Sequence, residues 1–324
     1  MHVENARQRP GLYQITPERW RAACARHRAL GRRLDVSIGW DGEGLEAALK
    51  DATILIGVPD RREHLAQRAP RLRWLHHTSA GVDGLLPLDW LPARLAFTNN
   101  RGAHGIKAEQ YMRMAYTLLN TRMPELIANQ RARRWEQVFS PNIEGRTALV
   151  VGLGDLGQAC VRAAAKLDMK VVGVSRTGKR VPGASAVYPI DKLDRLVPTA
   201  DFVAVAVPLT SETRKLIDRR RLGLMKPGSG LINIARAPVV DYDALREHLS
   251  SGHLGGAVVD VTDPEPLPPD SPLWDTPNLM ITPHISCDDS EHYIDITLDL
   301  WFANLARFLQ RKPLKNRVDA RRGY

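Results

Sequence analysis

Short apolar runs alternate with amphipathic stretches along the first hundred residues of the chain. Helix-like segments occur at Leu45 to Lys50 and at Arg61 to Arg68, and Thr16-Pro17 supplies the capping residue and the first-turn proline that begin a helix. The runs expected as strands are Leu12 to Ile15, Leu34 to Ile38, Ala52 to Val58, Leu72 to His76 and Leu95 to Thr98. This alternation predicts parallel strands joined by crossover helices.

The pattern becomes helical and amphipathic from about Gly105 to Arg133, which predicts one long helix that carries the chain from one domain into the next. Residues from about 289 to 310 are helical again. Between these helices lie short apolar runs, typical of strands buried on both faces: Ala148 to Val151, Lys170 to Ser175, Phe202 to Val207, Leu231 to Ile234, Ala257 to Val261 and Leu279 to Ile281. A second parallel sheet is therefore expected.

The first of these strands runs directly into Gly152-Leu153-Gly154-Asp155-Leu156-Gly157, and a helix-like segment follows from Gln158 to about Leu167. In a Gly-x-Gly-x-x-Gly turn, Gly152 makes the tight bend, Gly154 lets the backbone approach a diphosphate, and Gly157 lets the helix pack on the strand. The N–H groups at the start of the helix then bind the diphosphate. Because strand, turn and helix come in this order, the sequence predicts a dinucleotide site rather than a plain turn.

The end of the second strand of this sheet indicates which dinucleotide binds. A site for NAD normally ends there in Asp or Glu, which binds the adenine ribose. This chain has Ser175-Arg176-Thr177 instead, followed by Lys179 and Arg180. A guanidinium and two hydroxyls suit a 2′-phosphate, so NADP(H) is favoured and NAD(H) stays possible. The alternative is that Arg176 is one more surface arginine.

Composition limits the class of protein. The 324 residues are 44% hydrophobic and 25% charged, no apolar run reaches the roughly 20 residues of a membrane span, and the first residues lack a secretion signal. Three widely spaced cysteines, Cys24, Cys160 and Cys287, form no CxxC pair, which favours a reducing, cytoplasmic setting. The net charge of +10 comes from scattered arginines without a nucleic-acid module, so we expect anionic small molecules as partners, and neither nucleic acid nor a membrane.

Three side chains follow three different strands of the second sheet: Arg236, Glu265 and His284. Reduction of a 2-keto acid needs a cation to bind the carboxylate and polarise the carbonyl, which arginine provides with paired hydrogen bonds. The oxygen needs a proton from an acid that titrates near neutrality, which is the range of histidine, and a carboxylate would orient the imidazole. Taken singly, each residue has an ordinary alternative as a solvated surface group.

The sequence around these residues resembles the D-isomer-specific 2-hydroxyacid dehydrogenases, from about residue 50 to the end of the chain. The matching segments are Ser79 to Asp83, the glycine motif, Val207 to Thr210 with Thr213, Met225 to Gly228, Ile232 to Arg236, Gly256 to Pro266, Thr282 to Ser286 and Lys312 to Val318.

The resemblance implies an α/β fold with two Rossmann-like doubly wound domains. The cofactor domain, residues 104–287, is inserted into a flavodoxin-like substrate domain formed by residues 1–103 and 288–324. Dimerisation through the cofactor domain is a further family expectation.

The resemblance also assigns roles to side chains. Arg236 would bind the substrate, Glu265 would be the partner of the histidine, and His284 would be the acid and base; no metal is expected. Asp260 would hold the nicotinamide carboxamide, and backbone N–H groups of Ser79, Ala80 and Gly81 would receive the substrate carboxylate. The residues expected around the cofactor are Gly152, Gly154, Asp155, Leu156, Gly157, Ser175, Arg176, Thr177, Val207, Pro208, Thr213, Ile234, Ala235, Arg236, Asp260 and His284.

The chain departs from the family pattern at Ala237-Pro238, which stiffens the loop after Arg236, and at Thr262, Arg101 and His104. These departures affect substrate choice and loop mobility. The expected activity is NADP(H)-dependent reduction of a small 2-keto acid, with glyoxylate or hydroxypyruvate as first candidates. Two alternatives stay open: oxidation of another small acid such as phosphite on the same scaffold, and a nucleotide-sensing corepressor-like binding protein.

Overall fold

The computed structural model describes all residues from 1 to 324, and the chain divides into two compact units. Unit 1 consists of Met1–Ala103 and Asp289–Tyr324, and unit 2 consists of His104–Asp288. Unit 2 is thus a continuous insertion in the sequence of unit 1. Each unit has its own sheet and its own core, so each is described by itself.

Unit 1 contains a five-stranded parallel sheet with the order β2-β1-β3-β4-β5. This is the flavodoxin-like order, in which the chain reverses its direction of winding between β1 and β3. The strands are β1 (His2–Asn5), β2 (Ser37–Trp40), β3 (Ile54–Ile56), β4 (Trp74–His76) and β5 (Ala96–Thr98).

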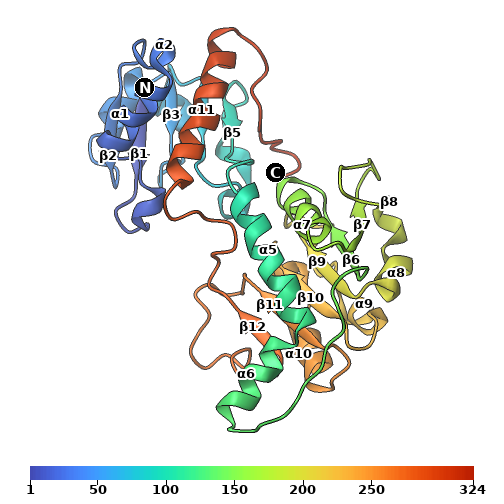
Figure 1. The fold of residues 1–324 in the computed structure, drawn as a ribbon. Helices are drawn as coiled ribbons and strands as arrows, with labels where there is room; N and C mark the ends of the chain where they lie inside the picture. The colour runs from blue at the N-terminus through green and yellow to red at the C-terminus, as the bar shows by residue number, and fades with distance from the viewer. The chain divides into compact units, whose positions relative to one another are not determined.

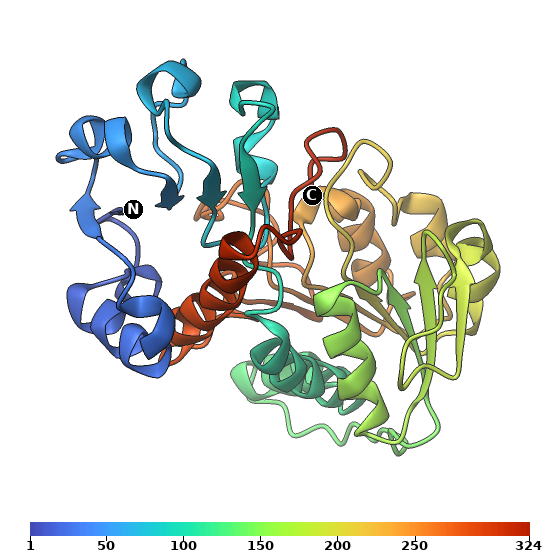
Figure 2. The ribbon, with the colours of Figure 1, turned by 90° about the horizontal axis from the view of Figure 1, so that it is seen from above.

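Helices cover both faces of this sheet. On one face α1 (Pro17–Arg26) and α11 (Tyr293–Leu309) pack against β1, β3 and β4, with Trp74 and Trp301 stacked 5.3 Å apart in the core. Figures 1 and 2 both show α11, in red, beside α1. On the other face lie α3 (Leu45–Asp51) and α4 (Leu65–Arg68). The remaining short helices are α2 (Arg28–Gly31), η1 (Gly11–Tyr13), η2 (Asp83–Leu85) and η3 (Leu88–Trp90).

Unit 2 contains a seven-stranded parallel sheet with the order β12-β11-β10-β9-β6-β7-β8. The winding direction reverses between β6 and β9, as in dinucleotide-binding folds. The strands are β6 (Thr147–Val151), β7 (Lys170–Ser175), β8 (Ala186–Pro189), β9 (Phe202–Val205), β10 (Gly230–Asn233), β11 (Gly256–Val259) and β12 (Leu279–Ile281).

One face of this sheet packs against α5 (Gly105–Asn120) and α7 (Asp155–Ala165), which lie side by side in Figures 1 and 2. The opposite face packs against α8 (Leu193–Leu196), α9 (Arg219–Leu224) and α10 (Tyr242–Ser250). The other helices are α6 (Met123–Arg131), η4 (Ile190–Lys192), η5 (Val197–Thr199) and η6 (Ala237–Val239). None of the helices combines the length and the apolar character that crossing a membrane requires.

The predicted fold class, α/β with two doubly wound parallel sheets, is confirmed. The strand predicted at Leu12 to Ile15 is wrong: Gly11–Tyr13 is a turn of 3-10 helix, and the first strand is His2–Asn5. The single helix predicted from Gly105 to Arg133 is also wrong. It breaks after Asn120, because Arg122 adopts a left-handed conformation (φ +55°) and Pro124 begins a new helix.

Candidate active site

The three motif glycines occupy three different environments at the carboxyl end of β6. A Cβ atom at Gly152 (φ +95°) would lie 2.6 Å from the carbonyl oxygen of Ala206, and one at Gly157 would lie 1.8 Å from the carbonyl oxygen of Gly152. At Gly154, which caps α7, a Cβ atom would meet nothing within 4 Å. The first and third glycines are therefore required by packing. The second faces open space at the N-terminus of α7, which fits a diphosphate on the helix N–H groups.

The residues predicted to choose the dinucleotide follow β7 directly. Ser175 is half-buried and its Oγ accepts a hydrogen bond of 3.1 Å from the backbone N–H of Gly178. Arg176 and Thr177 are exposed, and no carboxylate occurs between Ser175 and Ser185. The turn thus presents cationic and hydroxyl groups at the place where an NAD site presents an acid.

Hydrogen bonds fix the loop after β9 and the beginning of the segment after β10. The hydroxyl of Thr213 donates to the carbonyl of Pro208 (2.6 Å) and accepts from the N–H of Thr210 (2.8 Å). The loop begins at Val207, whose side chain reaches the glycine turn: its Cγ1 would lie 2.8 Å from a Cβ atom at Gly152. Ile234 continues β10 by donating its N–H to the carbonyl of Val205 (3.3 Å).

Arg236 is positioned by a buried asparagine that precedes it. The amide of Asn233 donates to the carbonyl of Arg236 (3.2 Å), and its oxygen accepts from the N–H of Ala235 (3.0 Å). Asn233 also donates to the hydroxyl of Tyr242, which donates to the carbonyl of Val261 (2.6 Å). The half-buried Arg236 therefore stands on a turn that is tied to both β10 and the segment after β11.

Glu265 and His284 form a pair. Nδ1 of His284 lies 2.8 Å from Oε2 of Glu265, and Oε1 of the same carboxylate accepts from the backbone N–H of Thr262 (2.9 Å). The side chains are 46% and 38% exposed, so the ring remains accessible within unit 2. A proton on Nδ1 donates to the carboxylate, which leaves Nε2 as the nitrogen that can exchange a proton with a substrate.

Asp260 is the buried brace of the histidine loop. Its Oδ1 accepts from the hydroxyl of Thr282 (2.6 Å) and from the N–H of Ile285 (2.9 Å), and its Oδ2 accepts from the N–H of Ser286 (2.9 Å). The residue is only 1% exposed. The carboxylate thus fixes the backbone on both sides of His284, whose own φ is +54°. Its predicted contact with the nicotinamide carboxamide stays a prediction.

Sequence reasoning missed two parts of this network, Tyr111 and Thr282. The hydroxyl of Tyr111 on α5 lies 2.7 Å from the hydroxyl of Thr282, and burial raises the pKa of Tyr111 well above its usual value. No spacing rule joins residues so far apart in sequence. Only the packing of α5 against the sheet brings them together.

The predicted substrate loop lies in unit 1, after β4. Its carbonyls are engaged by side chains: Tyr293 and Asn100 donate to Thr78, and Asn99 donates to Ala80 at 2.7 Å. This fixes the backbone around Ser79, Ala80 and Gly81. All other predicted site residues lie in unit 2, where Arg236, Glu265 and His284 follow the adjacent strands β10, β11 and β12.

The three cysteines are free thiols. Burial raises the pKa of Cys287 to about 12, so this thiol beside the histidine loop stays protonated and unreactive at neutral pH. No group of three or more His, Cys, Asp or Glu side chains is arranged to hold a metal ion.

Comparisons with known proteins agree with this geometry. Residues 114–286, more than half of the chain, match the model of the D-isomer specific 2-hydroxyacid dehydrogenase NAD binding domain. The curated glyoxylate reductase of Thermofilum pendens is 30% identical over 246 residues, which are 73% of this chain and 72% of that protein. Among the first curated relatives, the chain spans between about half and 86% of their length.

Two solved structures are similar over the whole chain. A D-isomer specific 2-hydroxyacid dehydrogenase from Xanthobacter autotrophicus Py2, in complex with NADPH and MES, is 31% identical, with a TM-score of 0.86 and coverage of 100% and 99%. An NADPH-dependent glyoxylate/hydroxypyruvate reductase from Sinorhizobium meliloti, in complex with NADP and sulfate, is 26% identical, with a TM-score of 0.83 and the same coverage. The family resemblance of the sequence is thereby confirmed: the chain belongs to the D-isomer-specific 2-hydroxyacid dehydrogenases and is an oxidoreductase that uses a nicotinamide cofactor.

Proposed function

We propose that the protein is an NADP(H)-dependent reductase of small 2-keto acids. The observation that carries this proposal is the pair formed by His284 and Glu265, with Arg236 on the neighbouring strand end. A fixed cation and an oriented imidazole are the groups that carbonyl reduction requires. Both follow strands of the same sheet as the glycine turn that fits a dinucleotide.

The bound cofactor supplies a hydride to C2 of the keto acid. His284 gives the carbonyl oxygen its proton from Nε2, while Glu265 holds the ring through Nδ1. Arg236 binds the carboxylate and stabilises the negative charge that develops on the oxygen. Asp260, through the backbone of Ile285 and Ser286, keeps the imidazole in place during the reaction.

The preference for NADP(H) rests on Ser175, Arg176 and Thr177, which offer donors to a 2′-phosphate and no carboxylate to repel it. The two similar structures above contain NADPH or NADP, which supports the same choice. Dependence on NADPH favours reduction as the physiological direction. Glyoxylate and hydroxypyruvate are the first substrate candidates, in line with the names of the relatives.

In this proposal unit 2 (His104–Asp288) is the cofactor domain and unit 1 (Met1–Ala103 with Asp289–Tyr324) is the substrate domain. The backbone N–H groups of Ser79, Ala80 and Gly81 receive the substrate carboxylate. The cofactor rests against the glycine turn and the loops that contain Val207, Pro208, Thr213, Ile234 and Ala235. The free cysteines are compatible with a cytoplasmic location.

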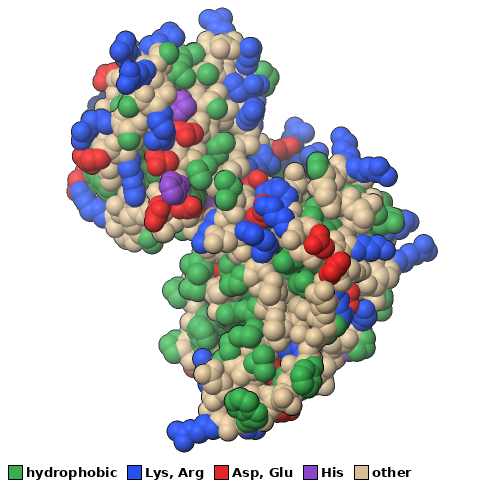
Figure 3. Space-filling model, in the orientation of Figure 1, with side chains coloured by type: hydrophobic (Ala, Val, Ile, Leu, Met, Phe, Trp, Pro, Cys, Tyr) green, Lys and Arg blue, Asp and Glu red, His purple; other side chains and the backbone are tan.

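We also propose a homodimer formed through unit 2. Large apolar side chains are exposed there on or next to α5 and α6: Ile106, Met114, Met123, Trp135 and Phe139. In Figure 3 hydrophobic side chains gather on the part of unit 2 where these helices lie. Exposed apolar side chains that gather on one surface are typical of protein–protein interaction sites. Light scattering would show twice the chain mass, and a monomer at micromolar concentration would contradict the dimer.

The function is tested by following oxidation of NADPH and NADH in parallel with glyoxylate, hydroxypyruvate, pyruvate and a branched keto acid. Turnover that prefers NADPH supports both the reaction and the cofactor assignment. Tight NADPH binding without turnover on any keto acid would favour an unlisted acid or a sensor. Absence of NADPH binding would contradict both the cofactor assignment and the proposed reaction.

A further inference from the structure

Unit 1 contains a cavity of about 440 Å³ at the carboxyl ends of β1, β3 and β4. Among its walls are Asn5, Arg9, Gly57, Pro59 and Thr78. This is the point where the winding of the sheet reverses, which is where open parallel sheets bind ligands. The volume lies in the range of small-molecule pockets, about 300–1,000 Å³. Thr78 joins the cavity directly to the loop predicted to receive the substrate carboxylate.

Most carboxylates around this cavity already have partners. Glu4 accepts from the N–H of Gly42 (2.6 Å) and pairs with His2, and Asp41 is held by Arg7, which lies outside the cavity lining. Glu46 is paired with Arg68. Only Asp60 among the acids of the lining forms no ion pair, and it is exposed.

Arg9 is the lining cation that is half-buried beside the predicted substrate loop. Its guanidinium lies over the ring of Tyr13, 4.6 Å from the centroid, and its Nη2 is 3.4 Å from Oγ of Ser79. It forms no ion pair with a carboxylate, and a contact of 3.4 Å with a hydroxyl is a weak hydrogen bond. The guanidinium therefore keeps donors for an anion.

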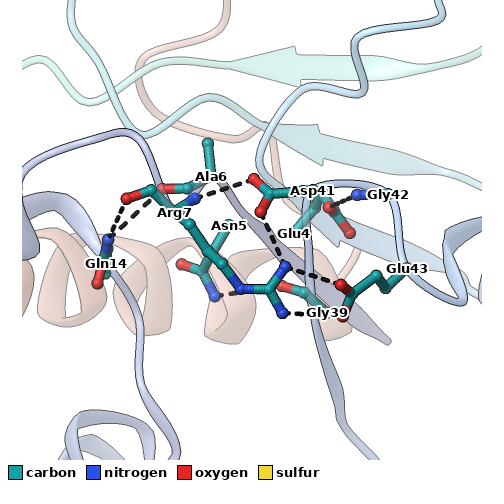
Figure 4. A network of polar contacts seen from close by, with 9 residues as sticks. All are labelled: Glu4, Asn5, Ala6, Arg7, Gln14, Gly39, Asp41, Gly42 and Glu43. Carbon is teal, nitrogen blue, oxygen red and sulfur yellow. Dashed lines mark hydrogen bonds and ion pairs between the residues drawn. The ribbon is translucent and has the colours of Figure 1, made fainter.

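The segment that contains Arg9 is fixed by a polar network (Figure 4). Gln14 donates to the carbonyls of Ala6 and Arg7. It also donates to the carbonyl of Arg9, at 2.8 Å. The N–H of Arg7 donates to Asp41 (2.9 Å), and its guanidinium donates to Asp41 and Glu43. The backbone of Arg9 is thus fixed before any ligand arrives, which lowers the entropic cost of binding.

Arg9 also acts on the imidazole of His77, which lines the same cavity. Burial, and then the charge of Arg9, lower the pKa of His77 to about 4. At neutral pH the ring is uncharged, and because it already forms a hydrogen bond with the backbone of Gly81, one ring nitrogen is left for a ligand.

The lining of the cavity also contains Arg61, Arg62 and Arg68. Arg68 is paired with Glu46 and Arg61 is exposed, so Arg9 and Arg62 are the half-buried cations without a carboxylate partner. Of these two, Arg9 is the one that reaches the predicted substrate loop, and the neutral imidazole of His77 lines the same cavity.

We infer that Arg9 is a specificity-determining residue that binds a second anionic group, a carboxylate or a phosphate, at the far end of the keto acid. This inference rests on the proposed function, which assigns the common carboxylate to Arg236 and to the N–H groups of the loop. A two- or three-carbon keto acid has few heavy atoms. If each heavy atom occupies about 30 Å³, the volume of one water molecule, such an acid fills only part of the cavity. A longer keto acid with a terminal anion fills the space and meets Arg9.

The test compares pairs of substrates that share a carbon chain and differ in the terminal group. The carboxylate arm uses 2-oxoglutarate against 2-oxopentanoate, and the phosphate arm uses 3-phosphohydroxypyruvate against hydroxypyruvate. The native protein should have a kcat/KM at least about 10-fold higher for the anionic member of one arm, the value expected from a charged hydrogen bond of roughly 1.5–3 kcal/mol. The arm with the larger ratio identifies the group.

Three variants locate the effect. Arg9→Met should lower kcat/KM for the anionic substrate about 10- to 100-fold, mainly through KM, and should leave the neutral substrate within about 2-fold. Arg9→Lys should restore part of the loss. Arg33→Met removes the same charge from an exposed position of unit 1 and should change neither substrate. Equal loss on both substrates, or a native preference for the neutral member in both arms, would overturn the inference.

The inference can be separated from the proposed function by measuring binding alone. If no keto acid is turned over, calorimetry with 2-oxoglutarate and 3-phosphohydroxypyruvate on the native protein and on Arg9→Met still decides the role of Arg9. Binding that weakens about 10-fold or more in the variant supports it. Identical affinities, or no binding to the native protein, contradict it.

Discussion

The two units place polar groups at the carboxyl ends of their parallel strands in different ways. In unit 2 the groups stand within a few residues of strands β6, β10, β11 and β12, and a single buried carboxylate, Asp260, braces the histidine loop. In unit 1 the corresponding edge is a cavity whose charged groups come from β1 and from the segments after β1, β2 and β3, and most of its carboxylates form ion pairs. We propose that one sheet edge carries out the chemistry and that the other selects the ligand.

Among the variants that test this comparison, we expect Asp260→Asn to have the largest effect on stability. The NH2 group of the new asparagine would face the backbone N–H groups that now donate to the carboxylate. We therefore expect the free energy of unfolding to fall by about 3 kcal/mol. We expect kcat to fall about 10- to 100-fold, because His284 is displaced. Denaturant titration and steady-state kinetics measure both. Thr282→Val, which removes one hydrogen bond, should cost only about 1 kcal/mol. A loss of cofactor affinity without loss of stability would mean that Asp260 acts on the nicotinamide and not as a brace.

Unit 1 is tested by Gly57→Ala. A Cβ atom there would lie 2.3 Å from the carbonyl oxygen of Glu4, and φ is +94°, so strand β1 and the segment after β3 must separate. We expect a loss of about 2 kcal/mol or more in unfolding free energy. Gly42→Ala has a similar φ (+82°) but no atom within 4 Å, and should cost about 1 kcal/mol. Equal costs would show that the close approach at Gly57 does not constrain the cavity.

Arg176→Ala tests the cofactor side of unit 2. We expect the Kd for NADPH to rise about 10- to 100-fold, because a charged hydrogen bond to the 2′-phosphate is lost. The Kd for NADH, which has no such phosphate, should stay within about 2-fold. Fluorescence titration measures both. An equal rise for the two cofactors would contradict the phosphate assignment.

A last prediction concerns the dependence of stability on pH in unit 1. Burial lowers the pKa of His76 to about 3, and burial with Arg9 lowers that of His77 to about 4. The unfolded chain protonates both below about pH 6.5, so stability should fall as the pH falls from there toward 4, by up to about 1.4 kcal/mol per pH unit for each group. Denaturant titrations across this window measure the slope. His76→Asn should flatten it, and a slope unchanged by this variant would exclude His76 as a source.

The sequence was informative where function depends on residues close together along the chain. Gly152, Gly154 and Gly157, the turn at Ser175 to Thr177, and the positions of Arg236, Glu265 and His284 after successive strands all follow from local patterns. The network of Asp260, Thr282 and Tyr111 did not, because it joins α5 to the histidine loop through tertiary packing alone. Strand β1 was missed for a related reason: His2 and Glu4 are polar, and only pairing between β2 and β3 buries this segment.

The role of Arg9 lay equally out of reach of a local pattern. It was one of eight arginines in the N-terminal region, and nothing in its neighbours distinguishes it. Its proximity to Ser79 depends on the order of strands in the sheet, which brings the segment after β1 next to the loop after β4.

The most direct test of the central claim, that the carboxyl edge of unit 2 performs carbonyl reduction, is His284→Ala measured for turnover and for NADPH binding in the same preparation. The account predicts a loss in kcat of about 10²- to 10⁴-fold, the usual contribution of a general acid, with NADPH affinity within about 2-fold of the native value. A variant that keeps more than about a tenth of the native kcat would contradict it, because proton donation by His284 would then contribute less than general acid catalysis supplies.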